Sequence, residues 1–536
     1  MNFRSPRAGL LLACTLAAVL RLPSFLYGVI SDDEAIYDAM ARTLAHGGVM
    51  YREAVDHKPP GLAYTYALFQ MLAHGNGALS MALVHLCGLL AVVLTCVALF
   101  QIARRVLPEE QQIWPPLLYA VFSACMQPAD ALAVNGELLM NLPVALCIVC
   151  ALEAGLRRSK WRALLLDLLA GALGTAAALY KYQAAVVLFA LPALWLSQVP
   201  APLAAGSRER FGRAVTTVLR RGIPAVAGSL LGVAAVAEYF QAHGALRDAI
   251  GWGINFNRNY IAEGSPPLWA LERFGAQFLG VVLPGALLYG AGLLTVARLL
   301  RRRSGDARTG RPQEGGDIVA ARAFLALWTL FSLASVTLGL RFFGHYFLQA
   351  ELPLALLAAG PVHRLFAARP RLTTSALAIP ALAFFLIAAL PSLTQPILNA
   401  RDPDTRGIGQ AIEARTRPAD TIWVWGNVPQ LYYASSRSPG VRFTFCNYLT
   451  GLSPGTPSEY DDAKDPRAHA VSAAWSLVLS DLELRRPTLV LDTAAARIKS
   501  YGKFPIASYP LLAGYLAQHY KAEGAIEGVI VYRRSD

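Results

Sequence analysis

The chain has 536 residues; 55% are hydrophobic, only 15% are charged, and the mean hydropathy is +0.41. One water-soluble core cannot bury this much apolar surface, because an average soluble domain carries about 25% charged residues. The composition predicts a polytopic membrane protein and excludes the disordered, collagenous and disulfide-scaffold classes.

The net charge of +13 is unevenly distributed. Residues 396–536 hold 16 Lys and Arg against 14 Asp and Glu, so eleven of the excess basic residues fall within the first 395. They form short clusters between apolar runs, as the positive-inside rule expects of cytoplasmic loops, and not one basic face. We therefore expect no nucleic-acid partner. The seven cysteines show neither a disulfide framework nor the spacing of zinc ligands.

Apolar runs that suit membrane spans recur along the first 395 residues, and we predict about eleven transmembrane helices. The first run follows Arg4 and Arg7 and is too long for a signal core, so we interpret it as a span with a cytoplasmic N-terminus. An odd number of spans places the C-terminal segment outside the cytoplasm. The predicted spans are 8–28, 79–103, 112–128, 137–156, 163–180, 183–200, 222–242, 277–300, 320–340, 346–366 and 373–395.

Two outer segments, 30–78 and 243–277, are too long to be simple turns. The first contains apolar residues at helical spacing, which suits helices that lie along the membrane surface. Beyond residue 395, short apolar runs alternate with amphipathic ones. We predict a membrane region over 1–395 and a small soluble α/β domain over 396–536. Its predicted strands are Thr421–Trp425, Val441–Phe445, Thr488–Asp492 and Val529–Arg533.

The first outer segment carries the most informative polar residues. Asp33 and Glu34 follow the first span directly, and Asp56 and Lys58 stand shortly before the second. A carboxylate shielded at the membrane edge has a raised proton affinity and can act as a general base. A nearby lysine, aimed by the two prolines that follow it, can hold a phosphate group. A merely solvated loop fits the same spacing.

Further polar groups lie on the same predicted face. Ionisable groups at membrane depth are costly and tend to be functional. The alternatives are that Lys181 and Arg341 extend to lipid headgroups and that His345 is a packed, hydrogen-bonded residue. These further candidates are Asp130, Glu137, Lys181, Arg258, Arg341, His345 and Tyr346.

Three motifs together resemble a known enzyme family. They are the acidic pair Asp33-Glu34, the segment Asp56–Gly61 and the segment Arg341–Phe347. In this order they are similar to the GT-C glycosyltransferases of the protein-mannosyltransferase and lipid A aminoarabinose-transferase type, in particular the bacterial glycosyltransferase family 39 branch. The resemblance covers roughly residues 8–366, and the C-terminal domain is similar in layout only.

The resemblance implies an inverting glycosyltransferase that uses a polyprenyl-phosphate sugar on the extracytoplasmic face of the bacterial inner membrane. Asp33 would deprotonate the acceptor hydroxyl, and Glu34 would orient it. Lys58 matches the donor-side lysine of the family, and Asp130 or Glu137 would stand for a second acidic group. We infer that Lys181, Arg258, Arg341 and His345 complete a cradle for the donor phosphate, with Asp56 and Tyr346 on the acceptor side.

Lys and Arg can supply the positive charge that such a reaction needs, so we expect no cofactor and no metal ligand set; a divalent cation on the acidic loop stays an open alternative. The partners would be the lipid-linked donor, membrane lipids, and a lipid, glycan or protein acceptor. The main alternative function is a transporter or flippase, which broken helices and charges at the midplane would favour.

Overall fold

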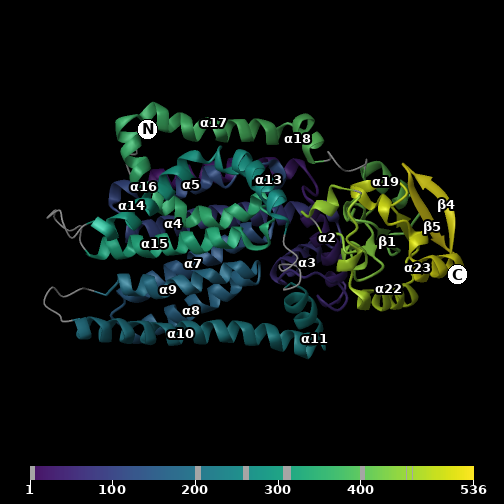
Figure 1. Ribbon diagram of the computed structural model, residues 1–536, viewed down its shortest axis with the longest axis horizontal. Coiled ribbons are helices and arrows are strands. Elements are labelled where there is room, and N and C mark those ends of the chain that lie inside the picture. The colour runs from purple at the N-terminus through teal and green to yellow at the C-terminus, as the bar shows by residue number, and fades with distance from the viewer. Residues whose placement is uncertain are drawn as a thin grey trace.

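A helical bundle and a C-terminal α/β domain lie end to end along the long axis of the computed structural model (Figure 1). The structure describes residues 6–199, 207–257, 265–305, 316–398, 405–453, 455–461 and 463–535. Most bundle helices run along this axis, so their ends face the C-terminal domain on one side (Figure 1).

Helices lie at all eleven positions where the sequence predicts a span. By length and apolarity, six of the described helices are able to cross a membrane, or seven if the bent pair Pro267–Val282 and Ala286–Leu299 forms one span. The chain is thus a multi-pass membrane protein. The bundle helices are α1 (Pro6–Arg21), α4 (Gly77–Val106), α5 (Trp114–Phe122), α7 (Gly136–Leu156), α8 (Lys160–Ala178), α9 (Val186–Ser197), α10 (Ser207–Ala242), α14 (Ala286–Gly305), α15 (Gly316–Val336), α16 (Leu348–Ala368) and α17 (Pro370–Ala389).

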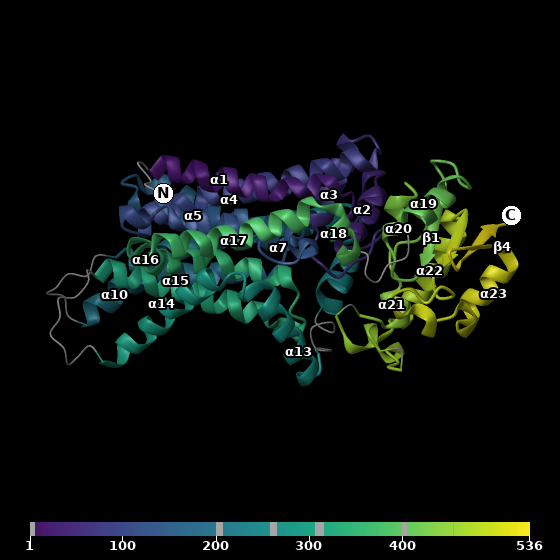
Figure 2. The ribbon, with the colours of Figure 1, turned by 90° about the horizontal axis from the view of Figure 1, so that it is seen from above.

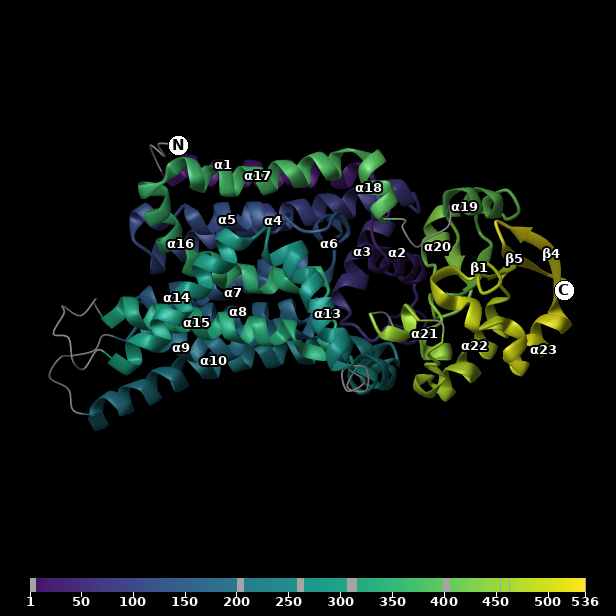
Figure 3. The ribbon, with the colours of Figure 1, turned by 45° about the horizontal axis from the view of Figure 1, so that its top comes forward.

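Shorter helices cover the end of the bundle that faces the C-terminal domain. The first outer segment forms α2 (Asp32–Ala45) and α3 (Gly61–Leu72), which lie between the bundle and that domain (Figures 1 and 2). Helices α6 (Pro128–Leu132) and α13 (Pro267–Gln277) lie at the same end (Figure 3). The same part of the chain also contains the π-helix Ala249–Phe256 and α18 (Pro391–Leu398).

The C-terminal domain contains a five-stranded mixed sheet with the strand order β2-β1-β3-β5-β4. Strands β2, β1 and β3 are parallel, whereas β5 pairs antiparallel with both β3 and β4. The strands are β1 (Thr421–Trp425), β2 (Ser438–Pro439), β3 (Leu489–Asp492), β4 (Tyr520–Ile526) and β5 (Val529–Arg534). The helices of this domain are α19 (Thr405–Glu413), α20 (Gln430–Ala434), α21 (Asn447–Thr450), α22 (Ser472–Arg485) and α23 (Pro510–His519).

One predicted strand of this domain is wrong. Val441–Phe445 is irregular, although Val441 and Phe443 are fully buried. The backbone N–H of Arg442 donates to the Asp481 carboxylate, and its carbonyl accepts from the N–H of Val55 in the first outer segment. The ring of Phe443 packs on Trp252 of the π-helix Ala249–Phe256 and on Tyr448 of α21, so this segment is buried by packing and not by pairing in the sheet.

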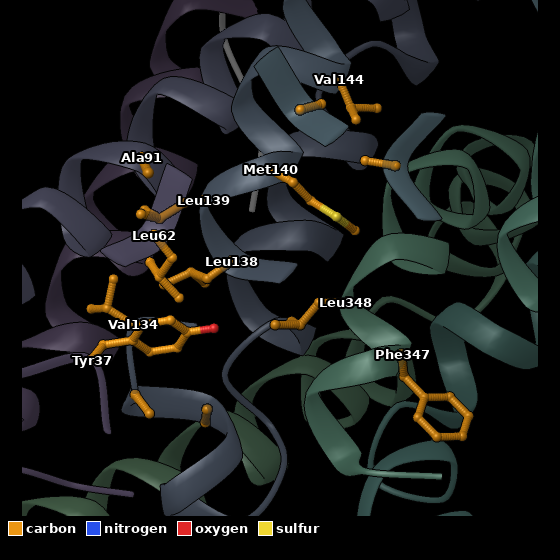
Figure 4. Close-up of a cluster of buried hydrophobic side chains, with 14 of the residues drawn as sticks. Tyr37, Leu62, Ala91, Val134, Leu138, Leu139, Met140, Val144, Phe347 and Leu348 are labelled. Carbon is orange, nitrogen blue, oxygen red and sulfur yellow. The ribbon is translucent and has the colours of Figure 1, made fainter. Parts of the chain in front are cut away.

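A buried apolar cluster lies directly behind the polar residues at the end of the bundle. Leu138 of α7 lies beside Leu62 and Tyr37, Leu139 lies near Ala91, and Met140 lies on the side of Leu348 (Figure 4). Each polar candidate precedes such an anchor by a few residues: Lys58 precedes Leu62, Glu137 precedes Leu138, and His345 precedes Leu348. Packing of the anchors therefore fixes where the polar side chains lie.

Candidate active site

A cavity of about 970 Å³ lies where the bundle meets the C-terminal domain. Its bundle side is formed by the segment that follows α1, by the start of α2, and by short loops beside α3, α6, α8 and α16. Its other side is formed by the C-terminal domain. The predicted candidates that line it are Asp33, Lys58, Asp130, Lys181, His345 and Tyr346.

The start of α2 separates the two predicted catalytic carboxylates. Ser31 caps this helix, because its side chain accepts a hydrogen bond from the N–H of Glu34 at 3.2 Å. Asp33 projects to the cavity. The Glu34 carboxylate instead accepts from the N–H groups of Ile30 and Val134, at 2.8 and 2.7 Å, and is fully buried. Glu34 therefore ties α2 to the loop before α7 and does not face an acceptor, contrary to the prediction.

Asp33 and Lys58 form an ion pair, with 2.6 Å between the Asp33 Oδ1 and the Lys58 Nζ. The Lys58 ammonium also lies 5.1 Å from the ring centroid of Tyr37, one helical turn after Asp33. The backbone of Lys58 is held as well, because the Tyr51 hydroxyl donates to its carbonyl at 2.8 Å. Asp33 of the acidic pair and Lys58 of the Lys-Pro-Pro element, 25 residues apart in the sequence, thus meet at one wall of the cavity.

Two more cation–carboxylate pairs lie on the bundle side. Lys181 Nζ is 2.7 Å from the Glu137 carboxylate and 4.4 Å from the ring centroid of Tyr346. His345 Nδ1 is 2.6 Å from the Asp130 carboxylate, which also accepts from the His345 backbone N–H at 3.2 Å. Glu137 itself does not line the cavity, but it holds the lysine that does.

These charges set the protonation of the site. Burial by itself would raise the pKa of Asp33, but the Lys58 ammonium, His345 and Lys181 outweigh it and lower this pKa. The prediction of a raised proton affinity for this carboxylate is therefore wrong, because sequence reasoning considered shielding and not the lysine. Burial would lower the pKa of Lys58, which Asp33 instead raises. The pKa of His345 is also raised, because Glu137, Asp130 and Asp33 together exceed the cost of its burial.

The C-terminal domain contributes a different chemistry. Its part of the cavity wall carries side-chain amides and phenol rings and is poorer in charge than the bundle side. The Glu459 carboxylate accepts from the N–H of Gly455, and the ring of Tyr460 packs on Trp269 of α13. The polar and aromatic residues of this wall include Asn427, Gln430, Tyr433, Asn447, Glu459 and Tyr460.

Of the three remaining candidates, the two that the structure describes, Arg341 and Asp56, do not line the cavity. Arg258 lies outside the described residues. Arg341 is buried behind the wall, so the prediction that it contacts the cavity directly is not met. Asp56 is also fully buried, 3.0 Å from the His57 ring and within 3.4 Å of the Tyr448 hydroxyl. It supports His57, which does line the cavity, and does not itself face an acceptor.

Sequence reasoning missed several wall residues. It also missed Tyr37, which does not line the cavity but lies under the Lys58 ammonium; a signal existed, because Tyr37 stands four residues after Asp33 on the same face of a predicted helix. His57 does line the cavity; its position next to Lys58 was the signal for it in the sequence. The residues of the C-terminal domain gave no signal, because no motif marks them and folding brings them to the cavity from about 400 residues away.

Part of the chain matches a known protein family, and its fold is similar to that of solved structures. Residues 57–204 match the family model described as dolichyl-phosphate-mannose-protein mannosyltransferase. The structure is similar to that of ArnT from Cupriavidus metallidurans bound to undecaprenyl phosphate, with a TM-score of 0.55 and 13% identity over 97% of each chain. It is also similar to the archaeal oligosaccharyltransferase AglB from Archaeoglobus fulgidus in complex with an inhibitory peptide and a dolichol-phosphate. There the TM-score is 0.51 and the identity 12%, over 99% of this chain and 74% of the other. A search of curated proteins gave no match.

Over residues 57–204 the family model agrees with the resemblance that the sequence predicts, which is to membrane glycosyltransferases. The likeness to the two solved structures confirms the fold: a polytopic helical bundle followed by a small α/β domain.

Proposed function

We propose that the protein is an inverting glycosyltransferase that moves a sugar from a polyprenyl-phosphate carrier to an acceptor hydroxyl or phosphate. The cavity wall of the bundle carries the observation that supports this most. Asp33 and three cations, Lys58, Lys181 and His345, face one space at the end of the bundle, which the carboxylates of Asp32 and Asp130 also line. One base and several fixed cations are what this reaction requires.

In this reaction the acceptor is activated while the carrier leaves. Asp33 takes the proton of the acceptor hydroxyl, and the acceptor oxygen forms a bond to the anomeric carbon from the side opposite the carrier. The bond between that carbon and the carrier oxygen breaks, and the carrier leaves as polyprenyl phosphate with an additional negative charge. The cations stabilise this developing charge. Attack from the opposite side inverts the configuration of the sugar.

The charges at the two ends of the bundle support an extracytoplasmic site. Arg105 at the end of α4 and Arg157 at the end of α7 both pair with Glu153, so these basic ends lie together. Both helices begin at the cavity end, because Gly77 and Asn135 stand beside it. By the positive-inside rule the basic end is cytoplasmic. We therefore place the cavity and the C-terminal domain on the periplasmic face of the bacterial inner membrane.

The wall of the C-terminal domain supports a role in selecting the acceptor. Side-chain amides both donate and accept hydrogen bonds, and phenol rings pack against apolar faces, so this wall suits a hydroxyl-bearing molecule. A lipid, a glycan and a protein side chain all offer such hydroxyls.

The variant Asp33→Asn tests the function. It keeps the shape of the side chain but cannot accept the proton, so we expect transfer of radiolabelled sugar from polyprenyl phosphate sugar to fall by at least about a hundredfold. Binding of undecaprenyl phosphate should persist. Full transfer activity in this variant would overturn the assignment of the base. Uptake of a solute into proteoliposomes without sugar transfer would favour the alternative, a transporter.

A further inference from the structure

The cations on the bundle side of the cavity wall already have carboxylate partners. Each of the three on the bundle side has a carboxylate within 2.7 Å: Lys58 with Asp33, Lys181 with Glu137, and His345 with Asp130. An anionic donor must therefore compete with a carboxylate for at least one of these cations. The effect of donor binding on the site depends on which of these ion pairs opens.

Of the three ion pairs, the one between Asp33 and Lys58 is held most weakly. Its side chains are 34% and 21% exposed, whereas that of Glu137 is only 4% exposed. Asp130 is bound twice, by the ring and by the backbone N–H of His345. Among the described residues, Lys58 provides the one polar contact that the structure gives for the Asp33 carboxylate. A partly exposed pair with a single contact exchanges at the lowest cost.

The charge balance of the proposed reaction points to the same pair. In the donor complex, Asp33 carries one negative charge and the phosphodiester carries another. When the acceptor proton moves to Asp33 and the bond from carrier oxygen to sugar breaks, Asp33 becomes neutral and the phosphate monoester gains that charge. One unit of negative charge thus passes from one possible partner of Lys58 to the other, while the total is unchanged.

We infer that the donor phosphate and the Asp33 carboxylate compete for Lys58, so that binding of the donor releases the catalytic base from its ion pair. This inference rests on the proposed function. Without donor, Lys58 holds Asp33 ionised and unreactive. With donor, Lys58 turns to the phosphate, and Asp33 is free to accept the acceptor proton. Asp33 therefore becomes a competent base only when the sugar donor is bound. This order protects Asp33 from unproductive proton transfer.

The test is the affinity of the full-length protein for undecaprenyl phosphate, measured in detergent at one low ionic strength. If Asp33 competes for Lys58, then Asp33→Asn should bind the lipid more tightly than the wild type, by roughly three- to tenfold. Lys58→Gln should bind it more weakly. In the Lys58→Gln background, Asp33→Asn should lose most of its effect, because the two residues are coupled only through the pair.

The neighbouring Asp32 provides the matched control. It lines the same cavity and carries the same charge, but it pairs with Lys499 of the C-terminal domain at 2.8 Å. Asp32→Asn should not tighten binding. If it tightens binding as much as Asp33→Asn, the effect is one of net charge and the inference is wrong. Equal or weaker binding by a folded Asp33→Asn, judged by its elution profile and melting temperature, also overturns it.

Failure of this inference and failure of the proposed function give different results. If the wild type binds undecaprenyl phosphate and Lys58→Gln does not, while Asp33→Asn binds as the wild type does, the function stands and the competition is refuted. If the wild type does not bind the lipid at all, both are refuted.

Discussion

His345 is the cation of the cavity wall whose charge depends on pH near neutrality, because an unperturbed histidine titrates at about pH 6.5. Its ring lies 2.6 Å from Asp130, and Glu137 and Asp33 add to the negative potential around it. The pKa of His345 is therefore raised in the folded protein. The protonated ring then contributes both to the stability of the fold and to the positive charge that the donor phosphate meets.

We predict that this contribution to stability is fully present below pH 6.5 and is lost as the pH rises through the raised pKa of the folded state. His345→Gln should lower the melting temperature by a few degrees at pH 6, since a hydrogen bond to a charged group contributes about 1.5–3 kcal/mol. The difference from the wild type should shrink as the pH approaches 9.

Melting curves in detergent across this pH range measure the effect. His74→Gln serves as the control, because the side chain of His74 is exposed, and its difference from the wild type should stay small at every pH. A difference for His345→Gln that grows with pH would contradict the sign of the shift.

At the scale of elements, two helix N-termini position Lys181. Gly61 begins α3 and Gly136 begins α7. A Cβ on Gly61 would lie 2.6 Å from the Leu179 carbonyl oxygen, and one on Gly136 would lie 2.5 Å from the Tyr180 carbonyl oxygen. The positive ends of two helices thus meet the last carbonyls before Lys181, and this arrangement is electrostatically favourable. The approach is this close because Gly61 and Gly136 lack a side chain.

We predict that Gly136→Ala displaces the turn that carries Lys181. A backbone oxygen cannot swing aside as the end of a side chain can, so the variant should lose about 1–3 kcal/mol of stability and bind undecaprenyl phosphate several-fold more weakly. Melting temperature and lipid affinity measure both effects. Gly290→Ala in α14, where a Cβ would contact nothing within 4 Å, should leave both unchanged or raise stability slightly. Equal effects of the two variants would refute the role of Gly136.

The elements themselves were largely predictable from the sequence, whereas their contacts were not. Hydrophobic runs placed a helix at each predicted span, and the segment that holds Asp33 and Glu34 begins a helix because a serine caps it. The two carboxylates could not be told apart, because the difference arises from Val134, whose N–H binds Glu34 from 100 residues away. The strand β4 escaped prediction because Tyr520–Ile526 is a mostly exposed edge strand with polar residues.

At the scale of the whole molecule, the cavity exists only because two parts of the chain close on each other. The motifs of the bundle predicted the residues on its bundle side, since they stand next to predicted spans. The C-terminal side depends on contacts such as that between Asp32 and Lys499, which are 467 residues apart, and no local pattern reports such a contact. The fold class and the bundle side of the cavity were thus accessible from the sequence, but the wall formed by the C-terminal domain was not.

The contact between Asp32 and Lys499 joins α2 to a segment with an unusual backbone. Arg497, Lys499 and Ser500 all have positive φ angles, of 56°, 48° and 64°, which non-glycine residues adopt at a cost. The Lys499 side chain is only 5% exposed and lies 2.8 Å from both carboxylate oxygens of Asp32. Because Asp33 follows Asp32 in the sequence, this ion pair holds the C-terminal domain directly beside Asp33, the residue that we propose as the base.

We predict that Asp32→Asn and Lys499→Gln each lower sugar transfer several-fold and stability by about 1 kcal/mol, because either change loosens the closure of the cavity. The double variant should be little worse than either single variant, since both remove the same contact. Transfer assays and melting temperatures of the four proteins form a double-mutant cycle.

Glu523→Gln, which removes the Arg533 pair within the sheet of the C-terminal domain, should change stability by less than about 0.5 kcal/mol and leave transfer intact. Additive losses in the cycle would mean that the two residues act separately, and that the closure of the domain on α2 depends on other contacts.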